Sequence, residues 1–405
     1  MLSTPMPATS GELREANLAR ALRTLHLREG ELTRARLAHE LRVTRATAGA
    51  LAAELAELGL VVEIAASPTG RRGRPTTRLV PAAGAPVVVA LEIAVDAVRT
   101  AVVGLGGRLD LTASASLDRH DVGHVLDVAR GQLHNCLAAL GRRCAGVGVA
   151  VYGLVEHGSG RVVLAPNLGW RNVELRAPLD LPAGLPVRID NVARLAALAE
   201  ARRGQARGHG SVLYLQAAVG LGGAVLLDGR PVRGSSGFAG ELGHLPLGHD
   251  DRSCRCGARG CWETEVDQLA LARAADRDAT PAQAATVAAA VLADAAGNDP
   301  GARRALERTA VVFGRGLGAL VNANDPDRIV LGGYLRDLYR AAPALIGRAM
   351  AEAAMHSHRG RLPPVTPSAL AADGGLLGAA EALFDDALAQ PTVLATHTAP
   401  TRRTT

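Results

Sequence analysis

Residues 244–263 read HLPLGHDDRSCRCGARGCWE, a stretch that crowds three cysteines into eight residues of a 405-residue chain. Cys254, Cys256 and Cys261 are separated by glycine-containing turns, and His244 lies ten positions before the first of them. Three thiolates and one imidazole make a closed tetrahedral ligand set, which is typical of structural rather than catalytic zinc. The stretch therefore predicts one structural Zn²⁺ per chain.

Two alternatives accompany this metal site. His249 is a rival for the fourth ligand, and the three cysteines could instead be free surface thiols. The other two cysteines, Cys136 and Cys144, lie in a segment read as helical and are expected to be small buried apolar side chains. Clustered cysteines in a reducing compartment favour a metal over disulfides.

The chain around the cysteine cluster alternates between strand-like and helix-like patterns. Runs rich in Val and Leu read as strands joined by Gly-rich connections, and Ala-rich segments read as helices. A repeated strand-then-helix order indicates an α/β fold. The strand-like segments are 87–95, 98–105, 147–155, 212–219 and 223–229, and the helix-like segments are 192–204, 281–296, 302–323 and 343–356.

Three motifs in this region resemble those of the ROK family, which comprises repressors, open reading frames and kinases. ELGH at 241–244 followed by CxCGxxGCxE at 254–263 resembles the family signature. NLGW at 167–170 resembles the family's PNLGW loop, and Gly332-Gly333 resembles the turn at which family kinases hold adenosine. The resemblance covers residues from about 13 to 385. It implies an actin/hexokinase-like ATPase-type fold, in which two α/β lobes close over a hexose and ATP.

Both phosphate loops depart from the pattern of the family's kinases. The first loop is usually Asp-x-Gly-Gly-Thr, and the matching stretch is EIAVD at 92–96. Phosphate loops need glycines so that backbone N–H groups can approach the anion, and Ala94 and Val95 obstruct that approach. Asp96 would repel phosphate. The second loop, usually Gly-Thr-Gly-x-Gly-Gly, reads AVGLGG at 218–223 and lacks the Thr hydroxyl.

The general base departs from the pattern as well. Family kinases carry Asn-Asp-Ala-Asn before an Ala-rich helix, and aligning that helix on LAALAE at 195–200 places Asn191 on the Asn and Val192 on the Asp. Without that carboxylate, no group there takes the proton from the sugar hydroxyl. Asp190 points elsewhere on this ungapped alignment, although a shift of one or two residues would restore it. Together the departures predict no catalytic residues and a loss of phosphotransfer.

The sugar side of the resemblance is better preserved. Asn191, Glu241, His244 and Glu263 match positions that contact hexose hydroxyls in family members. Carboxylates and amides suit this role because each forms paired hydrogen bonds with hydroxyl groups. His244 would place one ring nitrogen on zinc and its ring edge near the sugar. The alternative is that these polar groups only brace the metal loop, and Val192 weakens the sugar interpretation because the missing Asp would also bond the sugar.

The N-terminal residues carry the pattern of a winged helix-turn-helix, which the regulator branch of the family has and its free-standing sugar kinases lack. Apolar residues at helical spacing indicate the helices, and Thr33 and Thr44 are expected N-caps. The predicted elements are helices over 13–28, 33–41 and 44–58 and strands over 60–65 and 77–81.

Such a motif places its third helix in the major groove of DNA, with the first residues of that helix at the base edges. Here those residues are Thr44, Arg45 and Thr47. Arg45 can pair with guanine through two hydrogen bonds or clamp a phosphate, and Thr47 offers a hydroxyl and a methyl group. These three residues are the predicted major-groove contacts.

The predicted wing is a second candidate DNA contact. It reads Gly70-Arg71-Arg72-Gly73-Arg74-Pro75, and Arg71, Arg72 and Arg74 suit a narrow, electronegative minor groove. The alternative is a solvated basic turn. Residues 1–80 hold 12 Arg and 8 Glu without Asp, so they carry +4 of the formal net charge of +6. This uneven charge favours nucleic acid as the partner of the N-terminal unit.

Composition limits the class of protein further. With 48% apolar residues the chain can build a large core, and 405 residues fit two or three domains. The N-terminus lacks a basic segment followed by an apolar core, so no signal peptide is expected. The longest apolar run, near 87–95, is interrupted by Glu92 and is too short to span a membrane. We therefore expect a cytoplasmic protein without a membrane partner.

These observations predict a DNA-binding regulator, a repressor by expectation, that senses a sugar or sugar phosphate. A homodimer, or a dimer of dimers, would bind a pseudo-palindromic double-stranded DNA operator. One alternative is an active ATP-dependent sugar kinase that also carries a DNA-binding domain, and another is a regulator driven by a protein partner without a small ligand. The predicted domains are a mobile N-terminus (1–12), the winged helix-turn-helix (13–81), the ROK sugar-kinase-like domain (85–388) with its zinc loop (244–261), and a disordered tail (389–405).

Overall fold

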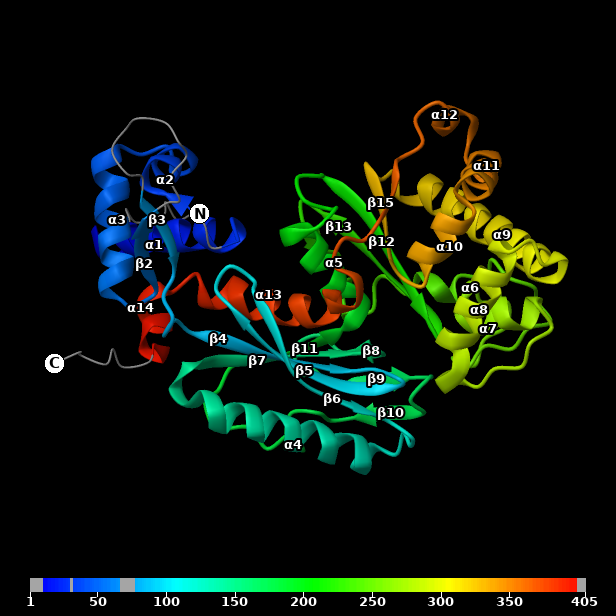
Figure 1. Ribbon diagram of the computed structural model, residues 1–405, viewed down its shortest axis with the longest axis horizontal. Coiled ribbons are helices and arrows are strands. Elements are labelled where there is room, and N and C mark those ends of the chain that lie inside the picture. The colour runs from blue at the N-terminus through cyan, green and yellow to red at the C-terminus, as the bar shows by residue number, and fades with distance from the viewer. Residues whose placement is uncertain (1–9, 30–31, 66–76, 399–405) are drawn as a thin grey trace, which may run out of the picture.

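The computed structural model describes residues 10–29, 32–65 and 77–398, which form a small N-terminal head and a larger body of two lobes (Figure 1). The elements of the head are α1 (Ser10–Leu27), β1 (Leu32–Thr33), α2 (Arg34–Leu41), α3 (Arg45–Glu57), β2 (Val61–Ala65) and β3 (Thr77–Pro81). The three strands form a sheet of order β1-β3-β2, and this is the winged helix-turn-helix arrangement that the sequence predicts.

Local hydrogen bonds explain where the second and third helices of the head begin. The Thr33 hydroxyl accepts the backbone N–H of Arg36, and the Thr44 hydroxyl accepts the backbone N–H of Thr47, each at 3.1 Å. Both threonines have extended backbone conformations, as N-caps require. The predicted wing residues 70–75 lie outside the described residues.

The first lobe is built on a five-stranded sheet of order β11-β7-β4-β5-β6. Its strands are β4 (Val87–Ile93), β5 (Ala97–Gly104), β6 (Leu109–Ser116), β7 (Cys144–Val151) and β11 (Val187–Asn191), and α4 (Val122–Leu140) covers one face (Figure 1). Every residue of β4 and β7 is buried. Cys144 therefore begins a central strand and not a helix, while Cys136 lies in α4, and both are buried as predicted.

A small three-stranded sheet lies at the end of the first lobe. It consists of β8 (Leu154–Val155), β9 (Val162–Ala165) and β10 (Trp170–Val173) in the order β10-β9-β8. Trp170 is 2% exposed and donates its ring N–H to the carbonyl oxygen of His120 at 2.8 Å. This packing holds the loop that carries Asn167 in place beside the cleft described below.

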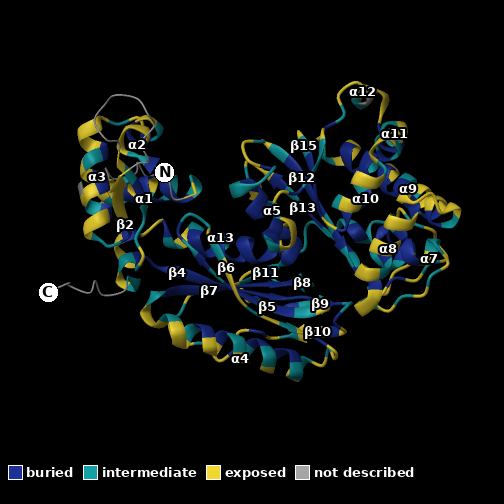
Figure 2. Cartoon of the chain, in the orientation of Figure 1, coloured by how far each residue is buried: buried dark blue, intermediate teal, exposed yellow. Residues whose placement is uncertain are grey.

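The second lobe has its own five-stranded sheet, of order β14-β13-β12-β15-β16. Its strands are β12 (Ser211–Ala218), β13 (Gly220–Leu227), β14 (Arg230–Pro231), β15 (Arg328–Gly333) and β16 (Val365–Pro367). The helices packed with it are α6 (Glu263–Val266), α7 (Gln268–Ala274), α8 (Ala284–Ala296), α9 (Pro300–Asn324), α10 (Leu335–Ala341), α11 (Pro343–Ala353) and α12 (His356–Arg359). Exposed residues collect on the outward faces of these helices and of α4 (Figure 2).

Two helices lie between the sheets of the two lobes: α5 (Val192–Arg203) and α13 (Gly374–Ala387) (Figure 1). They pack closely because Gly378 has no side chain, since a Cβ there would collide with the carbonyl oxygen of Leu195. Both helices begin between the lobes and end against the head. These two helices therefore connect the region between the lobes to the head.

A buried polar cluster joins the head to these two helices. His26 of α1, Arg203 of α5 and Glu381 of α13 are all nearly inaccessible to solvent. His26 Nε2 lies 3.1 Å from Glu381 Oε2, and Arg203 Nε donates to Glu381 Oε1 at 2.6 Å. Burial by itself would raise the pKa of Glu381, but the neighbouring His26 and Arg203 hold it below its ordinary value. Buried hydrogen bonds and ion pairs therefore fix the contact of the head with α5 and α13.

The ends of the chain differ from the sequence prediction. Helix α1 begins at Ser10, inside the segment expected to be mobile. In the predicted disordered tail, α14 (Pro391–Leu394) packs with the head: Leu394 is 3% exposed, and the Thr392 hydroxyl donates to Glu15 Oε1 at 2.9 Å. The tail lacks a periodic pattern because only one turn of helix contacts the core. No described helix combines the length and apolar composition needed to cross a membrane.

Candidate ligand cleft and metal centre

A cleft of about 400 Å³ lies between the two lobes, a volume within the range of small-molecule sites. Its walls are the starts of α5 and α13, the β4–β5 turn, the β12–β13 hairpin and the loop that carries Glu241. Four residues predicted to bind sugar, Asn191, Glu241, His244 and Glu263, all line this cleft. The fold thus brings together residues from distant parts of the sequence.

The four predicted metal ligands also come together. His244 Nδ1 lies 3.7 Å from Cys254 Sγ, and the sulfur atoms of Cys256 and Cys261 lie 3.7 Å apart. All four ligand atoms lie within 4.8 Å of one another, and His249 is not a member of the group formed by the described residues. A tetrahedral zinc with Zn–S bonds of about 2.3 Å separates its sulfur ligands by about 3.8 Å. The donor set therefore fits a structural zinc ion.

The chemistry of the thiols supports the same conclusion. Burial raises the pKa values of Cys254 and Cys261, so an unliganded pair would stay protonated at neutral pH. A bound cation would stabilise the thiolates and close the loop. The turns between the cysteines need left-handed backbone at Gly257 and Gly260, where φ is +101° and +68°. Such angles favour glycine.

Glu263 connects the metal loop to the cleft. It is the first residue of α6, and its Oε1 lies 3.7 Å from His244 Nδ1. Its Oε2 accepts the backbone N–H of Leu221 in the β12–β13 hairpin at 3.1 Å. Both carboxylate oxygens of Glu263 therefore contact groups of the protein. This supports the alternative from the sequence analysis in which Glu263 braces the metal loop.

Glu241 is a carboxylate of the metal-loop wall that remains available to a ligand. It precedes the short 3₁₀ turn Leu242–His244, is partly exposed, and its Oε2 lies 3.9 Å from His244 Nε2, too far for a hydrogen bond. Burial raises its pKa above the ordinary value for a glutamate. Asn191, in contrast, is heavily engaged: its Oδ1 caps α5 by accepting the N–H groups of Ala193 and Arg194, and its Nδ2 donates to Gly153 O at 2.8 Å.

Ionic groups occupy the opposite end of the cleft, where the family resemblance places the first phosphate loop. Arg99 of β5 donates to Glu92 Oε1 at 3.3 Å and to Asp373 Oδ1 at 2.8 Å. Burial raises the pKa of Glu92 to about 7, and the positive charge of Arg99 opposes that shift. With Asp96 also in the lining, three carboxyl groups face one guanidinium. This arrangement disfavours an incoming polyphosphate.

The second phosphate loop is occupied in a similar way. It is the tight hairpin between β12 and β13, and its backbone N–H groups would have to face the phosphate. The N–H of Gly220 instead donates to Asp267 Oδ2 at 2.9 Å, while that of Leu221 donates to Glu263. Burial raises the pKa of Asp267 to about 6. Two carboxyl groups therefore already hold the donors that a phosphate would use.

The position of the expected general base holds an apolar side chain. Val192 is 4% exposed and lies in the cleft wall at the start of α5. Asp190 turns away from the cleft and forms ion pairs with Arg194 and Arg233. It is 5% exposed and does not line the cleft. The alternative in which Asp190 replaces the missing base has no support in this geometry.

The predicted DNA contacts lie at the exposed start of α3. Arg45 is exposed, and its side chain forms no hydrogen bond or ion pair with any other described residue. The hydroxyls of Thr44 and Thr47 are 2.9 Å apart, and the Thr44 hydroxyl also caps the helix. Thr44 thus has a structural task, whereas Arg45 is available to DNA. The remaining predicted contacts, Arg71, Arg72 and Arg74, lie outside the described residues.

Sequence reasoning missed Arg99, which lines the cleft, and the carboxylates Asp373 and Asp267, which bind groups of the cleft wall from outside its lining. Arg99 and Asp373 are 274 positions apart, and Asp267 is 47 positions from the N–H that it binds. No local pattern links such residues. Asp267 carries one local signal, because it is an Asp directly before a helix and its Oδ1 caps α7 by accepting the N–H of Ala270.

Comparisons with curated proteins extend beyond the motifs. The xylose repressor of Bacillus subtilis (strain 168) is 25% identical over 303 residues, which cover 73% of this chain and 77% of that protein. The glucokinase of Streptomyces coelicolor is 32% identical over 214 residues, which cover 49% of this chain and 68% of that protein. The chain is thus similar to both a regulator and a kinase.

The solved structures that resemble this chain also include both a kinase and a regulator. A ROK family glucokinase from Streptomyces griseus, in complex with glucose and AMPPNP, is 27% identical with a TM-score of 0.65, covering 73% of this chain and 98% of its own. A ROK family transcriptional regulator, a homolog of the E. coli MLC protein, has a TM-score of 0.72 at 22% identity and covers 95% of this chain and 99% of its own. The second structure therefore shares the fold of nearly the whole chain.

The family model for ROK proteins, described as "ROK family", matches residues 88–386, which make up most of the body. The ELGH and CxCGxxGC motifs lie within this match and form the metal centre and one wall of the cleft. The chain belongs to the ROK family.

Proposed function

We propose that this protein is a sugar-responsive, DNA-binding transcriptional repressor. One observation carries the proposal: a winged helix with an exposed Arg45 is joined to a ROK body whose cleft keeps Glu241 and His244 but has Val192 at the expected base position. In this proposal the head binds DNA, and the cleft of the body binds the ligand that regulates it. The similarity to the xylose repressor supports the same interpretation.

The effector is a sugar or sugar phosphate bound between the lobes. Glu241 would accept a pair of sugar hydroxyls, and the ring edge of His244 would lie beside them. Structural zinc held by His244 and the three cysteines would keep this wall of the cleft in place. D-xylose and D-glucose are the first ligands to test, because the relatives are named for a xylose repressor and glucokinases.

The body does not transfer phosphate in this proposal. Val192 provides no base, and carboxyl groups occupy the donors of the second phosphate loop. One observation supports the alternative of an active kinase, which is the similarity of the chain to glucokinases. ADP formation with a hexose, abolished by Glu241→Gln, would establish that alternative.

Sugar binding reaches DNA through α5 and α13. Both helices begin at the cleft, and Arg203 at the end of α5 and Glu381 in the middle of α13 meet His26 of the head. Lobe closure would change the tilt of the head, and a dimer would then lose the spacing of about one helical turn between its recognition helices. A sugar acts only through its different affinity for the two arrangements, and a ratio of about 100 corresponds to about 2.7 kcal/mol.

The experiment begins with selection of genomic DNA fragments by the purified full-length protein. Fluorescence anisotropy with the selected fragment then measures DNA affinity with and without each sugar. We expect Arg45→Gln to weaken binding to the selected fragment by about 10-fold or more, since one bidentate base contact contributes about 1–3 kcal/mol. The matched control is Arg171→Gln, an exposed arginine on β10 of the first lobe. Absence of any selected DNA would contradict the proposal, and DNA binding without a response to sugars would favour a protein partner as effector.

A further inference from the structure

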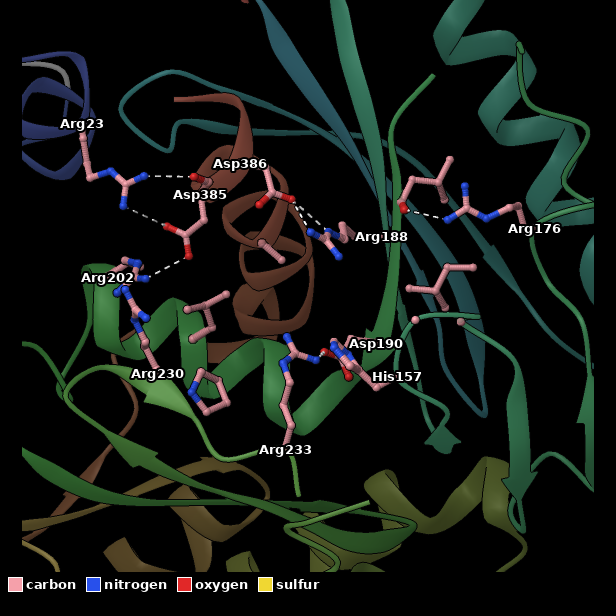
Figure 3. Close-up of a pocket in the computed structure, with 17 residues that line it drawn as sticks. Arg23, His157, Arg176, Arg188, Asp190, Arg202, Arg230, Arg233, Asp385 and Asp386 are labelled. Atoms are coloured by element: carbon pink, nitrogen blue, oxygen red, sulfur yellow. Dashed lines mark hydrogen bonds and ion pairs between the residues drawn. The ribbon is translucent and has the colours of Figure 1, made fainter. Parts of the chain in front are cut away.

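A second cavity, of about 510 Å³, lies at the junction of the head and the body, away from the inter-lobe cleft (Figure 3). We name it the arginine pocket after the six arginines that line it: Arg23, Arg176, Arg188, Arg202, Arg230 and Arg233. It shares no lining residue with the inter-lobe cleft among the residues that the structure describes. The two cavities can therefore be tested separately.

The arginine pocket carries a positive charge that the nearby carboxylates do not neutralise. Of the described residues, three acidic ones line it: Asp190, Asp385 and Asp386. Asp190 must also neutralise Arg194, which pairs with it from outside the lining. Six guanidinium groups and three carboxylates thus line the pocket, which leaves a formal charge of +3 before Arg194 is counted.

Several of these guanidinium groups lack a close carboxylate. Arg230 is exposed and forms no hydrogen bond or ion pair with its side chain within the described part of the chain. Arg176 donates to the carbonyl oxygen of Val187 at 3.0 Å and has no ion pair with a described residue. Arg23 donates to the carbonyl oxygen of Asp385 at 2.9 Å, and its closest approach to that carboxylate is 4.0 Å. Their N–H groups remain available to an anion.

The other arginines are held in position around the cavity, as Figure 3 shows. Arg202 donates to Asp385 Oδ2 at 2.9 Å, and Arg188 donates to Asp386 Oδ2 at 3.0 Å. Arg233 pairs with the buried Asp190. These pairs orient guanidinium groups before a ligand arrives, which lowers the cost of binding.

We propose that the arginine pocket binds a phosphorylated small metabolite. The planar guanidinium fork matches the oxygens of a phosphoryl group and donates two hydrogen bonds to it, and the dianion would offset much of the unneutralised charge. The volume is in the range of sites for small molecules. Duplex DNA is not the proposed occupant, because the pocket is lined by Arg23 of α1 and by residues of the body, and no residue of α3 lines it.

The position of the pocket gives this ligand a regulatory effect. Arg23 belongs to the head, Arg202 to the end of α5, and Arg230 to the second lobe. A phosphoryl group bound by all three would tie the head to α5 and to the second lobe in one arrangement. It would therefore change DNA affinity only as far as it binds the DNA-competent and incompetent arrangements differently.

The test is isothermal titration calorimetry on the full-length protein with glucose 6-phosphate, inorganic phosphate and glucose as probes. We expect the two phosphate-bearing probes to bind and Arg230→Gln to weaken both by about 10-fold. The control Arg171→Gln, an exposed arginine outside the pocket, should leave both affinities unchanged. Thermal unfolding of each variant checks that it is folded, and Arg176→Gln repeats the test from the other side of the pocket.

Three results would overturn the proposal. The first is an absence of heat with both phosphate-bearing probes. The second is loss of phosphate binding in Glu241→Gln but not in Arg230→Gln, which would place the phosphate in the inter-lobe cleft. The third is a loss of affinity for random-sequence duplex DNA in Arg230→Gln that equals the loss of affinity for the phosphate-bearing probes. That result would make the pocket a DNA contact. Inorganic phosphate contains no sugar, so the result with that probe and Arg230→Gln is distinct from failure of the sugar-responsive function.

Discussion

The two ends of the inter-lobe cleft are built into the same fold but have opposite chemistry. At one end, the four metal ligands hold a wall from which Glu241 faces the cavity, with no hydrogen bond to the nearby His244. At the other end, Arg99 donates to Glu92 and Asp373. In this cleft, Glu241 therefore stays available to a ligand, whereas the charged groups at the phosphate end bind one another.

The largest effect is expected from removal of the metal, which should lower sugar affinity at the end of the cleft that carries Glu241, called the open end below. The end that carries Arg99 and Glu92 is called the closed or phosphate end. Cys256→Ser takes away one of four ligands, so zinc content should fall well below one per chain, and sugar affinity should fall by more than about 100-fold as the wall loosens. The nucleotide end should be unaffected. Metal analysis and calorimetry measure both changes. The matched control is Cys136→Ser in α4, outside the cluster, and full zinc retention in Cys256→Ser would count against the site.

The pH dependence of stability tests the closed end. Burial gives Glu92 a folded-state pKa of about 7, against an ordinary glutamate value of 4.5. A carboxyl with a raised pKa stabilises the fold when protonated, so its contribution is present below about pH 4.5 and is lost as the pH rises through 7. Glu92→Gln should therefore become more stable than the unmodified protein over this interval, by at most about 3 kcal/mol.

Denaturant unfolding of both proteins between pH 4 and 8 measures that difference. Arg99, Asp96 and Asp373 are the charged groups around Glu92, and all three are unchanged in the variant. An advantage of the variant that grows on acidification would mean that Glu92 is ionised and held by Arg99. The ion pair with Arg99, and not burial, would then set the pKa of Glu92, and the expected pH dependence would be wrong.

Glu241→Gln tests the open end. A hydrogen bond to a charged group contributes about 1.5–3 kcal/mol, so sugar affinity should fall by about 10- to 100-fold. Glu92→Gln at the other end serves as the matched control and should change sugar affinity by less than about 2-fold. Calorimetry with the sugar that releases DNA measures both. Equal losses in the two variants would place the sugar across the whole cleft.

Restoration of the base should have the smallest effect. Val192→Asp supplies the carboxylate that the family's kinases use, yet Asp267 and Glu263 still occupy the backbone donors of the second phosphate loop. We expect no increase in ADP formation over the unmodified protein in a coupled assay with ATP and sugar. Turnover by the single variant would show that the nucleotide end is competent and only the base is missing.

The sequence predicts some parts of this molecule better than others for physical reasons. The helix caps Thr33 and Thr44 and the metal ligands depend on residues close together in the chain, so local spacing identifies them. The substitution at Val192 is visible because an Ala-rich helix follows it and sets the alignment.

The remaining features depend on pairs that the sequence keeps far apart. Arg99 meets Asp373 across 274 positions, and Glu381 of α13 meets His26 of the head across 355. The same reason explains the error in the tail, since α14 is held by contacts with Glu15 and not by its own pattern. The structure at these positions therefore depends on contacts between distant residues and not on local helix or strand propensity.

The proposed function requires that the cleft bind sugar without transferring phosphate, and that this binding reach DNA. A single titration examines both requirements: the selected DNA fragment, the protein and ATP are held together while sugar is added, and DNA anisotropy and ADP are followed at once. We expect release of DNA over the range of sugar concentration at which calorimetry shows binding, with no ADP above background. ADP that rises with the same sugar dependence and disappears in Glu241→Gln would instead identify a working kinase.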